Sequence, residues 1–326
     1  MATSTRTRRS RALLAALIAA VAVSLVAGGC GDDEESGGGA TGGGGAVLDG
    51  ASLAVGSKEF TEQLILGKIT VAVLENAGAK VNDQTGLAGS VAARKALEAG
   101  EIDMYWEYTG TNWLTYLKET KPISDAQKQY DAVAQAEVKN KIKLLDPAPA
   151  NNTYAFAVRE EAAADLGVVK ISDFKTLVGE RPDEATLCVG EEFTARDDGL
   201  PGVEKTYGFK FPEDGVIKID EGIIYTEVDK GGKCNFGEVF ITDGRIAANK
   251  LTVLEDDQKF FPVYNPALNV RQDAIDKYPK LAELFNPVAA KLDSATLQKL
   301  NAQVDVDGLP EEEVAQQWLE ENGFME

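Results

Sequence analysis

Short apolar runs alternate with amphipathic stretches in the first part of the folded chain. Apolar residues spaced for one face of a helix lie between runs that suit buried strands. The predicted elements are a strand at 52–55, a helix at 61–76, a strand at 80–81, a helix at 89–99 and a strand at 102–105. This alternation predicts an α/β fold with a parallel sheet.

The same alternation continues to the end of the chain. Further predicted elements are a helix at 125–140, strands at 142–145, 154–158, 186–189, 239–241 and 263–271, a helix opening at 172, and a mainly helical end over 279–323. The run 146–149 contains two prolines and interrupts the pattern, so we expect it to cross between two lobes. We expect residues 251–254 to be the return crossing.

The N-terminus has the pattern of an export signal. Four arginines precede an apolar run over 12–27, which is too short for a comfortable membrane span. Small residues then precede Cys30, in a pattern that resembles the lipidation site of bacterial lipoproteins; the alternative is an ordinary secretory signal with an incidental Cys. We therefore predict a signal peptide over 1–29, a lipidated Cys30 and a glycine-rich tether over 30–46.

Composition excludes several classes of function. Without residues 1–29 the chain carries 29 Lys and Arg against 53 Asp and Glu, a net charge of −24, which disfavours binding to nucleic acid or anionic lipid. The chain has no His, so His-based catalytic triads and His-ligated zinc sites are excluded. Cys188 and Cys234 suggest one disulfide in an exported protein; two separate buried thiols are the alternative.

An aromatic cluster follows the strand at 102–105. Tyr105, Trp106 and Tyr108 fall within four residues, before a turn at Gly110 that is followed by Thr111. Aromatic faces and hydroxyls at the end of a strand suit a ligand that is partly cationic and partly polar, whereas the alternative is a buried aromatic strand.

Two basic residues also stand near predicted element ends. Lys58 is expected in the turn before the helix at 61–76, where the helix N-terminus favours anions; read alone, such a Lys is more often an ordinary solvated surface residue. Arg196 lies in a polar loop after a strand and could hold a carboxylate with two hydrogen bonds or pair with Asp197 or Asp198.

Separate motifs in order resemble the substrate-binding proteins of osmoprotectant ABC importers, which take up glycine betaine, choline and related quaternary amines. The resemblance covers roughly residues 52–323. The motifs are GSKEFTEQLILG at 56–67, EYTGT at 107–111, NTY at 152–154, FTARDDG at 193–199, TDGR at 242–245, LNAQV at 300–304, and the closing EEVA at 312–315 with WL at 318–319.

The resemblance implies a two-lobed periplasmic-binding-protein fold of type II, with the ligand in the cleft between the lobes. It places residues 50–150 and 255–326 in the first lobe and 151–254 in the second. It also implies a cage of aromatic rings around the quaternary ammonium, at Tyr108, Tyr154, Tyr225 and Phe240. The family often has Tyr at the position of Phe240, and the match at Tyr225 is looser.

The resemblance further implies that a ligand carboxylate is held by Lys58, Thr111 and Arg196, with Asn152 supporting the cage. These cations favour a betaine, because choline has no anion and would leave two buried cations unpaired.

The sequence thus predicts a lipid-anchored, extracytoplasmic binding protein, not an enzyme. It would be a monomer without cofactor or metal, delivering glycine betaine or proline betaine to an ABC permease with its ATPase. The alternatives are another solute, such as choline, carnitine or an amino acid, and an extracellular sensor without a transport role.

Overall fold

The computed structural model describes residues 47–325. The expected signal peptide, tether and lipidated Cys30 lie outside the described residues. The strands are β1 (Ser52–Lys58), β2 (Lys80–Leu87), β3 (Met104–Tyr108), β4 (Ile142–Leu144), β5 (Tyr154–Arg159), β6 (Leu187–Val189), β7 (Val216–Lys218), β8 (Phe236–Phe240), β9 (Leu251–Val253) and β10 (Pro266–Arg271). The helices are α1 (Thr61–Asn76), α2 (Gly89–Ala99), α3 (Thr109–Thr111), α4 (Ala126–Glu137), α5 (Glu160–Leu166), α6 (Phe174–Glu180), α7 (Glu191–Ala195), α8 (Leu200–Tyr207), α9 (Glu221–Lys230), α10 (Arg245–Ala248), α11 (Gln272–Lys277), α12 (Leu281–Ala289), α13 (Ser294–Asp305) and α14 (Glu311–Glu321).

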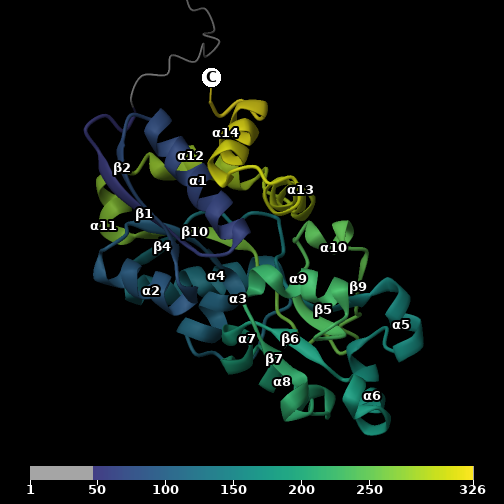
Figure 1. Cartoon of the computed structure of the whole chain (residues 1–326). Helices are drawn as coiled ribbons and strands as arrows, with labels where there is room; N and C mark the ends of the chain where they lie inside the picture. The colour runs from purple at the N-terminus through teal and green to yellow at the C-terminus, as the bar shows by residue number, and fades with distance from the viewer. Residues whose placement is uncertain (1–46, 326) are drawn as a thin grey trace, which may run out of the picture. The chain divides into compact units, whose positions relative to one another are not determined.

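The strands form two five-stranded sheets, each at the centre of one lobe (Figure 1). The first sheet has the order β2-β1-β3-β10-β4 and the second has β7-β6-β8-β5-β9. In each, three parallel strands are joined by an antiparallel strand that is the first strand after a crossing between the lobes: β10 pairs with β3, and β5 pairs with β8. The sheets are therefore mixed, and the predicted parallel order holds only for the first three strands of each.

Helices pack on the first sheet because this packing buries their apolar faces. Helix α1 packs between β1, β2 and α14, as Figure 1 shows. Its residues Ile65, Leu66 and Ile69 have no exposed surface and lie in one core with Leu53 and Trp318.

Several predicted elements occur at their expected positions. Helices α1 and α2 have the predicted limits of 61–76 and 89–99, and the chain is helical for most of its C-terminal part. The return crossing predicted at 251–254 is wrong, because residues 251–253 form β9 and pair with β5. Helices α8 and α9 and the short strand β7 were not predicted.

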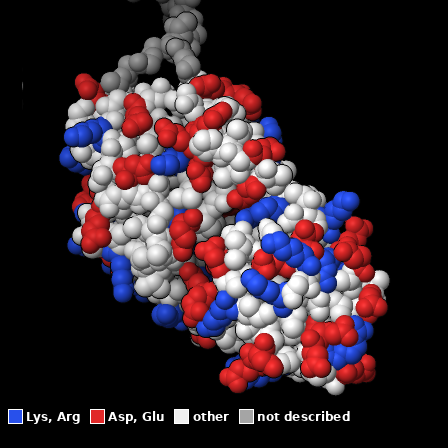
Figure 2. All heavy atoms as spheres, viewed as in Figure 1, with Lys and Arg blue, Asp and Glu red and all other residues white. Residues whose placement is uncertain are grey.

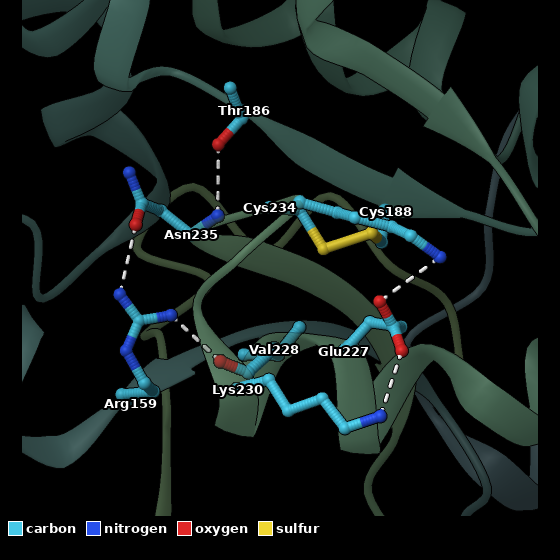
Figure 3. The surroundings of a disulfide bond; sticks show 9 residues. Arg159, Thr186, Cys188, Glu227, Val228, Lys230, Cys234 and Asn235 are labelled. Carbon is cyan, nitrogen blue, oxygen red and sulfur yellow. Dashed lines mark hydrogen bonds and ion pairs between the residues drawn. A yellow bond between two sulfur atoms is a disulfide. The ribbon is translucent and has the colours of Figure 1, made fainter.

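A disulfide between Cys188 and Cys234 ties β6 to the segment that follows α9 (Figure 3). Both residues are buried in the second lobe. Beside them, the Arg159 guanidinium donates to the Val228 carbonyl at 2.7 Å and to Asn235 Oδ1 at 2.9 Å, so the same segment is held by hydrogen bonds as well (Figure 3).

Removing the disulfide should destabilise the second lobe. The bond spans 46 residues, and restraint of a loop of this length in the unfolded chain corresponds to about 2–4 kcal/mol. The double variant Cys188→Ala/Cys234→Ala should lose about this much free energy of unfolding in urea titration. Unchanged stability would show that the bond does not form in the folded protein.

Candidate functional site

A cavity of about 1840 Å³ lies in the cleft, lined by residues of both lobes. The structure brings all eight residues predicted from the sequence to its walls: Lys58, Tyr108, Thr111, Asn152, Tyr154, Arg196, Tyr225 and Phe240. These residues come from segments that are up to 182 positions apart, at 58 and 240, so the fold alone brings them together.

The sheet topology explains why aromatic residues meet at this cavity. Tyr108 is the last residue of β3, and Phe240 is the last residue of β8. Tyr154 is the first residue of the antiparallel β5 and is paired in register with Phe240. The carboxyl ends of parallel strands line the crevice of open α/β sheets, which is where ligands bind in such folds.

The aromatic rings form a continuous wall. Phe60 lies nearly parallel to Tyr108, with ring centroids 6.3 Å apart, and to Phe240, at 5.2 Å. Tyr154 is 5.1 Å from Phe240 and has Tyr264 packed edge-on at 5.4 Å. Sequence reasoning did not assign Phe60 or Tyr264 to the site. The available signal for Phe60 was its position directly before α1, two residues after β1 ends.

Tyr225 occupies a different environment from the other rings. It is 2% exposed, and its hydroxyl accepts a hydrogen bond from the Phe240 backbone N–H at 3.0 Å. The Arg245 guanidinium lies 4.2 Å from the centroid of its ring. Tyr225 thus supports the end of β8, and a cation already occupies one of its faces.

Lys58 is paired within the protein. It is the last residue of β1, not part of a turn, and its Nζ lies 2.6 Å from Glu107 Oε1 with both side chains buried. Glu107 also accepts from the Tyr116 hydroxyl at 2.7 Å. Lys58 Nζ lies 4.9 Å from the centroid of the Tyr108 ring, so this ion pair lies beside the aromatic wall.

Arg196 is paired as well. Its guanidinium donates through two nitrogens to Asp198, with Nε at 2.8 Å, and contacts Glu192 at 2.7 Å. The expectation that Lys58 and Arg196 would be unpaired cations without a ligand carboxylate is therefore wrong. The argument against choline assumed that these two cations would be left unpaired, so it no longer holds.

Glu62 joins the two lobes at the base of the cleft. Its carboxylate accepts four hydrogen bonds: from the Tyr108 hydroxyl at 2.7 Å, Asn152 Nδ2 at 2.6 Å, Thr242 Oγ1 at 2.6 Å and Asn301 Nδ2 at 3.1 Å. Thr242 follows β8 in the second lobe, whereas Glu62 opens α1 in the first. Burial raises the pKa of Glu62 and exceeds the opposing effect of these four donors. Sequence reasoning missed this residue.

The cavity has an acidic excess. Its lining contains twelve Asp and Glu residues and six Lys and Arg residues. Acidic side chains are likewise visible over the face shown in Figure 2, among fewer basic ones. Such a lining attracts cations and disfavours anions that lack a dedicated partner.

Three glutamates lie together in the second lobe's wall. Burial, followed by repulsion from Glu192 and Glu59, raises the pKa of Glu221 to about 7. Burial, followed by repulsion from Glu221, raises the pKa of Glu238 well above its usual range. Burial acts in the same direction on Glu192, but Lys58 and other neighbours overcome it and lower its pKa to about 2.

Residues 47–325 contain neither a candidate membrane-spanning helix nor a candidate metal-binding group. No helix in this part of the chain is long and apolar enough to cross a membrane. No group of three or more His, Cys, Asp or Glu side chains is arranged there to hold a metal ion.

Comparison with known proteins gives consistent matches. Residues 51–321 match the family model described as the substrate binding domain of ABC-type glycine betaine transport systems. The chain is 37% identical over 280 residues to a glycine-betaine-binding protein of Pseudomonas aeruginosa, covering 84% of this chain and 89% of that protein. It is 36% identical over 276 residues to the glycine betaine-binding protein YehZ of Escherichia coli, covering 83% of this chain and 90% of that protein.

Solved structures agree with these relatives. The apo form of YehZ from Escherichia coli superposes with a TM-score of 0.62 at 34% identity, covering 84% of this chain and 99% of that one. A glycine betaine/carnitine/choline ABC transporter structure gives a TM-score of 0.67 at 27% identity, covering 84% of this chain and all of that one. The fold is thus that of the type II periplasmic binding proteins, as predicted.

The buried glutamates predict that the protein becomes more stable as the pH falls from 8 to 5.5. Glu221 ionises near pH 7 in the folded state but near 4.5 when unfolded, so the folded state binds the extra proton and the free energy of unfolding rises as the pH falls. The chain has no His to obscure this range. Thermal unfolding across the range should show the gain, and Glu221→Gln should reduce it.

The exposed Glu312 on α14 supplies the matched control for this measurement. Glu312→Gln should leave the pH dependence as in the wild type. A melting temperature that is flat or that falls on acidification would contradict the raised pKa values.

Proposed function

The chain belongs to the family of substrate-binding domains of ABC-type glycine betaine transport systems, and from this premise we propose that its cleft binds glycine betaine or proline betaine through an aromatic cage. Family membership makes it an extracytoplasmic substrate-binding protein for osmoprotectant import. The identity of the ligand and the cage are the parts that we propose.

The aromatic wall is the observation that carries the proposal. A quaternary ammonium has no N–H to donate, so proteins recognise it with aromatic faces within about 6 Å of the charge. The rings of Tyr108, Phe60, Phe240 and Tyr154 line one cavity from both lobes. Tyr225 would complete the cage from behind Phe240. Because Arg245 already covers one face of its ring, Tyr225 would contribute less to cation binding than the other rings.

The carboxylate of a betaine would bind beside this cage. An ammonium has three donors and a guanidinium has five, so Lys58 and Arg196 retain N–H groups beyond those in their ion pairs. Thr111 also lines the cavity, and Asn152 Nδ2 donates to the Tyr108 hydroxyl at 3.2 Å. Because the cations are already neutralised, choline and carnitine are the alternatives to test beside the betaines.

We propose further that the protein is a monomer, anchored through a lipid on Cys30, that delivers its ligand to an ABC permease with its ATPase. The pattern before Cys30 and the tether after it support this arrangement. A single chain whose two lobes close on a ligand in one cleft needs no second subunit to bind it.

Replacing Tyr108 should weaken binding of every quaternary amine. Tyr108→Ala removes a buried ring from the cage and should cost about 2 kcal/mol or more, measured by calorimetry with glycine betaine and choline. Neither Trp106 nor Trp113 lines the cavity, so calorimetry is a better measurement than tryptophan fluorescence. Tyr108→Phe keeps the ring but removes the hydrogen bond to Glu62, and so separates the two roles.

The control for this experiment is Tyr278→Ala, in the first lobe and outside the cavity lining. It should retain wild-type affinity. Wild-type affinity in Tyr108→Ala itself would refute the cage.

Replacing Arg196 should separate betaines from choline. Arg196→Ala removes donors available to a carboxylate, so the affinity for glycine betaine should fall at least tenfold more than the affinity for choline. Calorimetry with both ligands on the same preparation measures this ratio and cancels general damage to the cleft. Equal losses would show that Arg196 serves only its own ion pairs with Asp198 and Glu192.

A further inference from the structure

One buried polar atom in the cleft has no partner within the described residues. Glu238 is 2% exposed and lines the cavity, and its Oε1 makes no hydrogen bond there. Its other oxygen accepts from the Gly190 backbone N–H at 2.9 Å. A buried polar atom left without a partner is destabilising, so a donor supplied by a ligand would bind there favourably.

Glu238 lies close to the aromatic wall. It is two residues before Phe240 on β8, so the two side chains project from the same face of the sheet, about 7 Å apart along the strand. A ligand with its ammonium at Phe240 can therefore direct its other end towards Glu238.

Glu221 meets Glu238 at Gly190. A Cβ atom at Gly190 would lie 2.6 Å from Glu221 Oε1 and 2.7 Å from Glu221 Cγ, so the carboxyl group of Glu221 takes the space that a side chain at 190 would need. The Glu238 carboxyl group thus binds the Gly190 N–H, and the Glu221 carboxyl group packs against the Gly190 Cα. Because no hydrogen bond joins Glu221 to Glu238 in the described part of the chain, they do not satisfy one another.

Nearby cations do not satisfy this pair either. Lys58 forms its ion pair with Glu107, and Arg196 forms its ion pairs with Asp198 and Glu192. The described residues around the pair also include no group suited to a metal ion. What the pair lacks is a cationic donor: burial and repulsion from neighbouring carboxylates raise the pKa of both carboxyl groups, and a ligand ammonium beside them would favour their ionised, accepting form.

We propose, on the basis of the ligand class assigned above, that Glu238 and Glu221 form a second subsite in the cleft, which accepts a hydrogen bond from a primary ammonium group at the other end of a quaternary ammonium ligand. The subsite therefore extends the ligands of the cleft beyond the betaines, which carry no such donor, to quaternary amines with a second, protonated amine. The cavity of about 1840 Å³ exceeds the range of roughly 300–1,000 Å³ common for small-molecule sites, so it accommodates a ligand longer than glycine betaine.

A homologous series of probes tests the subsite. Calorimetry would compare ω-aminoalkyl-trimethylammonium ions with two to five methylenes against n-alkyl-trimethylammonium ions of the same length. At one or more lengths the terminal ammonium should raise affinity at least tenfold. The length at which the gain appears measures the distance from the cage to the subsite.

Variants assign the gain to the two glutamates. Glu238→Gln keeps an acceptor for the Gly190 N–H but cannot ionise beside a ligand ammonium, and should reduce the ratio of amino to alkyl affinity to threefold or less. Glu221→Gln is the second variant, in case Glu238→Gln folds poorly, and should reduce the same ratio. Glu312→Gln on the exposed face of α14 is the matched control and should keep the wild-type ratio.

The outcomes separate this inference from the proposed function. If alkyl-trimethylammonium ions bind but no chain length gains from the ammonium, the subsite is refuted and the cage stands. If a gain appears but survives in both glutamate variants, the subsite is again refuted. If no member of either series binds, the cage and the subsite that rests on it are both overturned.

Discussion

The carboxylate of Glu62 is the point on which the arrangement of the cleft depends. A buried carboxylate is unfavourable unless donors surround it, and its four donors come from separated segments of the chain. Thr242 belongs to the second lobe, while Tyr108 ends a strand of the first. All donors satisfy the carboxylate only when the lobes are together. The position of the Tyr108 ring is thereby coupled to the position of the second lobe, because one acceptor binds both. Asn301 reinforces this coupling, since its Nδ2 donates to Glu62 and also to the Thr242 carbonyl at 2.9 Å.

Charge inside the cleft follows a second constraint. Each cation near the aromatic wall has an internal acid within hydrogen-bond distance, as Lys58 has Glu107. Desolvating a lone ammonium would be costly, so internal pairing allows a buried cation to lie beside the aromatic rings without a ligand present. The acids that remain exceed the cations in number. A permanent positive charge on a ligand can therefore enter this cavity without displacing an ion pair. An anion must instead share donors that are already in use.

The sequence predicted the elements that depend on local pattern. Helices α1 and α2 have the expected limits, because apolar spacing and a following glycine determine them locally. It also predicted which residues meet in the cleft, through motifs. It did not predict how those residues are paired. Glu107 is 49 positions from Lys58, and Thr242 is 180 positions from Glu62, so only the tertiary structure reveals these bonds. Local spacing also misplaced the return crossing, because a three-residue edge strand such as β9 resembles an extended linker until its partner is known.

The aromatic stretch at 105–108 shows why adjacency in sequence does not imply a shared role. Side chains alternate across a strand, so β3 sends its residues to two faces. Trp106 points towards α1, where its Nε1 donates to Thr70 at 2.9 Å, and Tyr105 lies on the opposite face, 3.1 Å from Glu107. Both are buried, with exposures of 1% and 0%. Tyr108 shares the α1 face with Trp106, but it is the last residue of the strand, where the sheet ends and the cavity begins. Its role follows from the strand's length: had β3 ended two residues earlier, Trp106 would occupy the edge of the cleft instead.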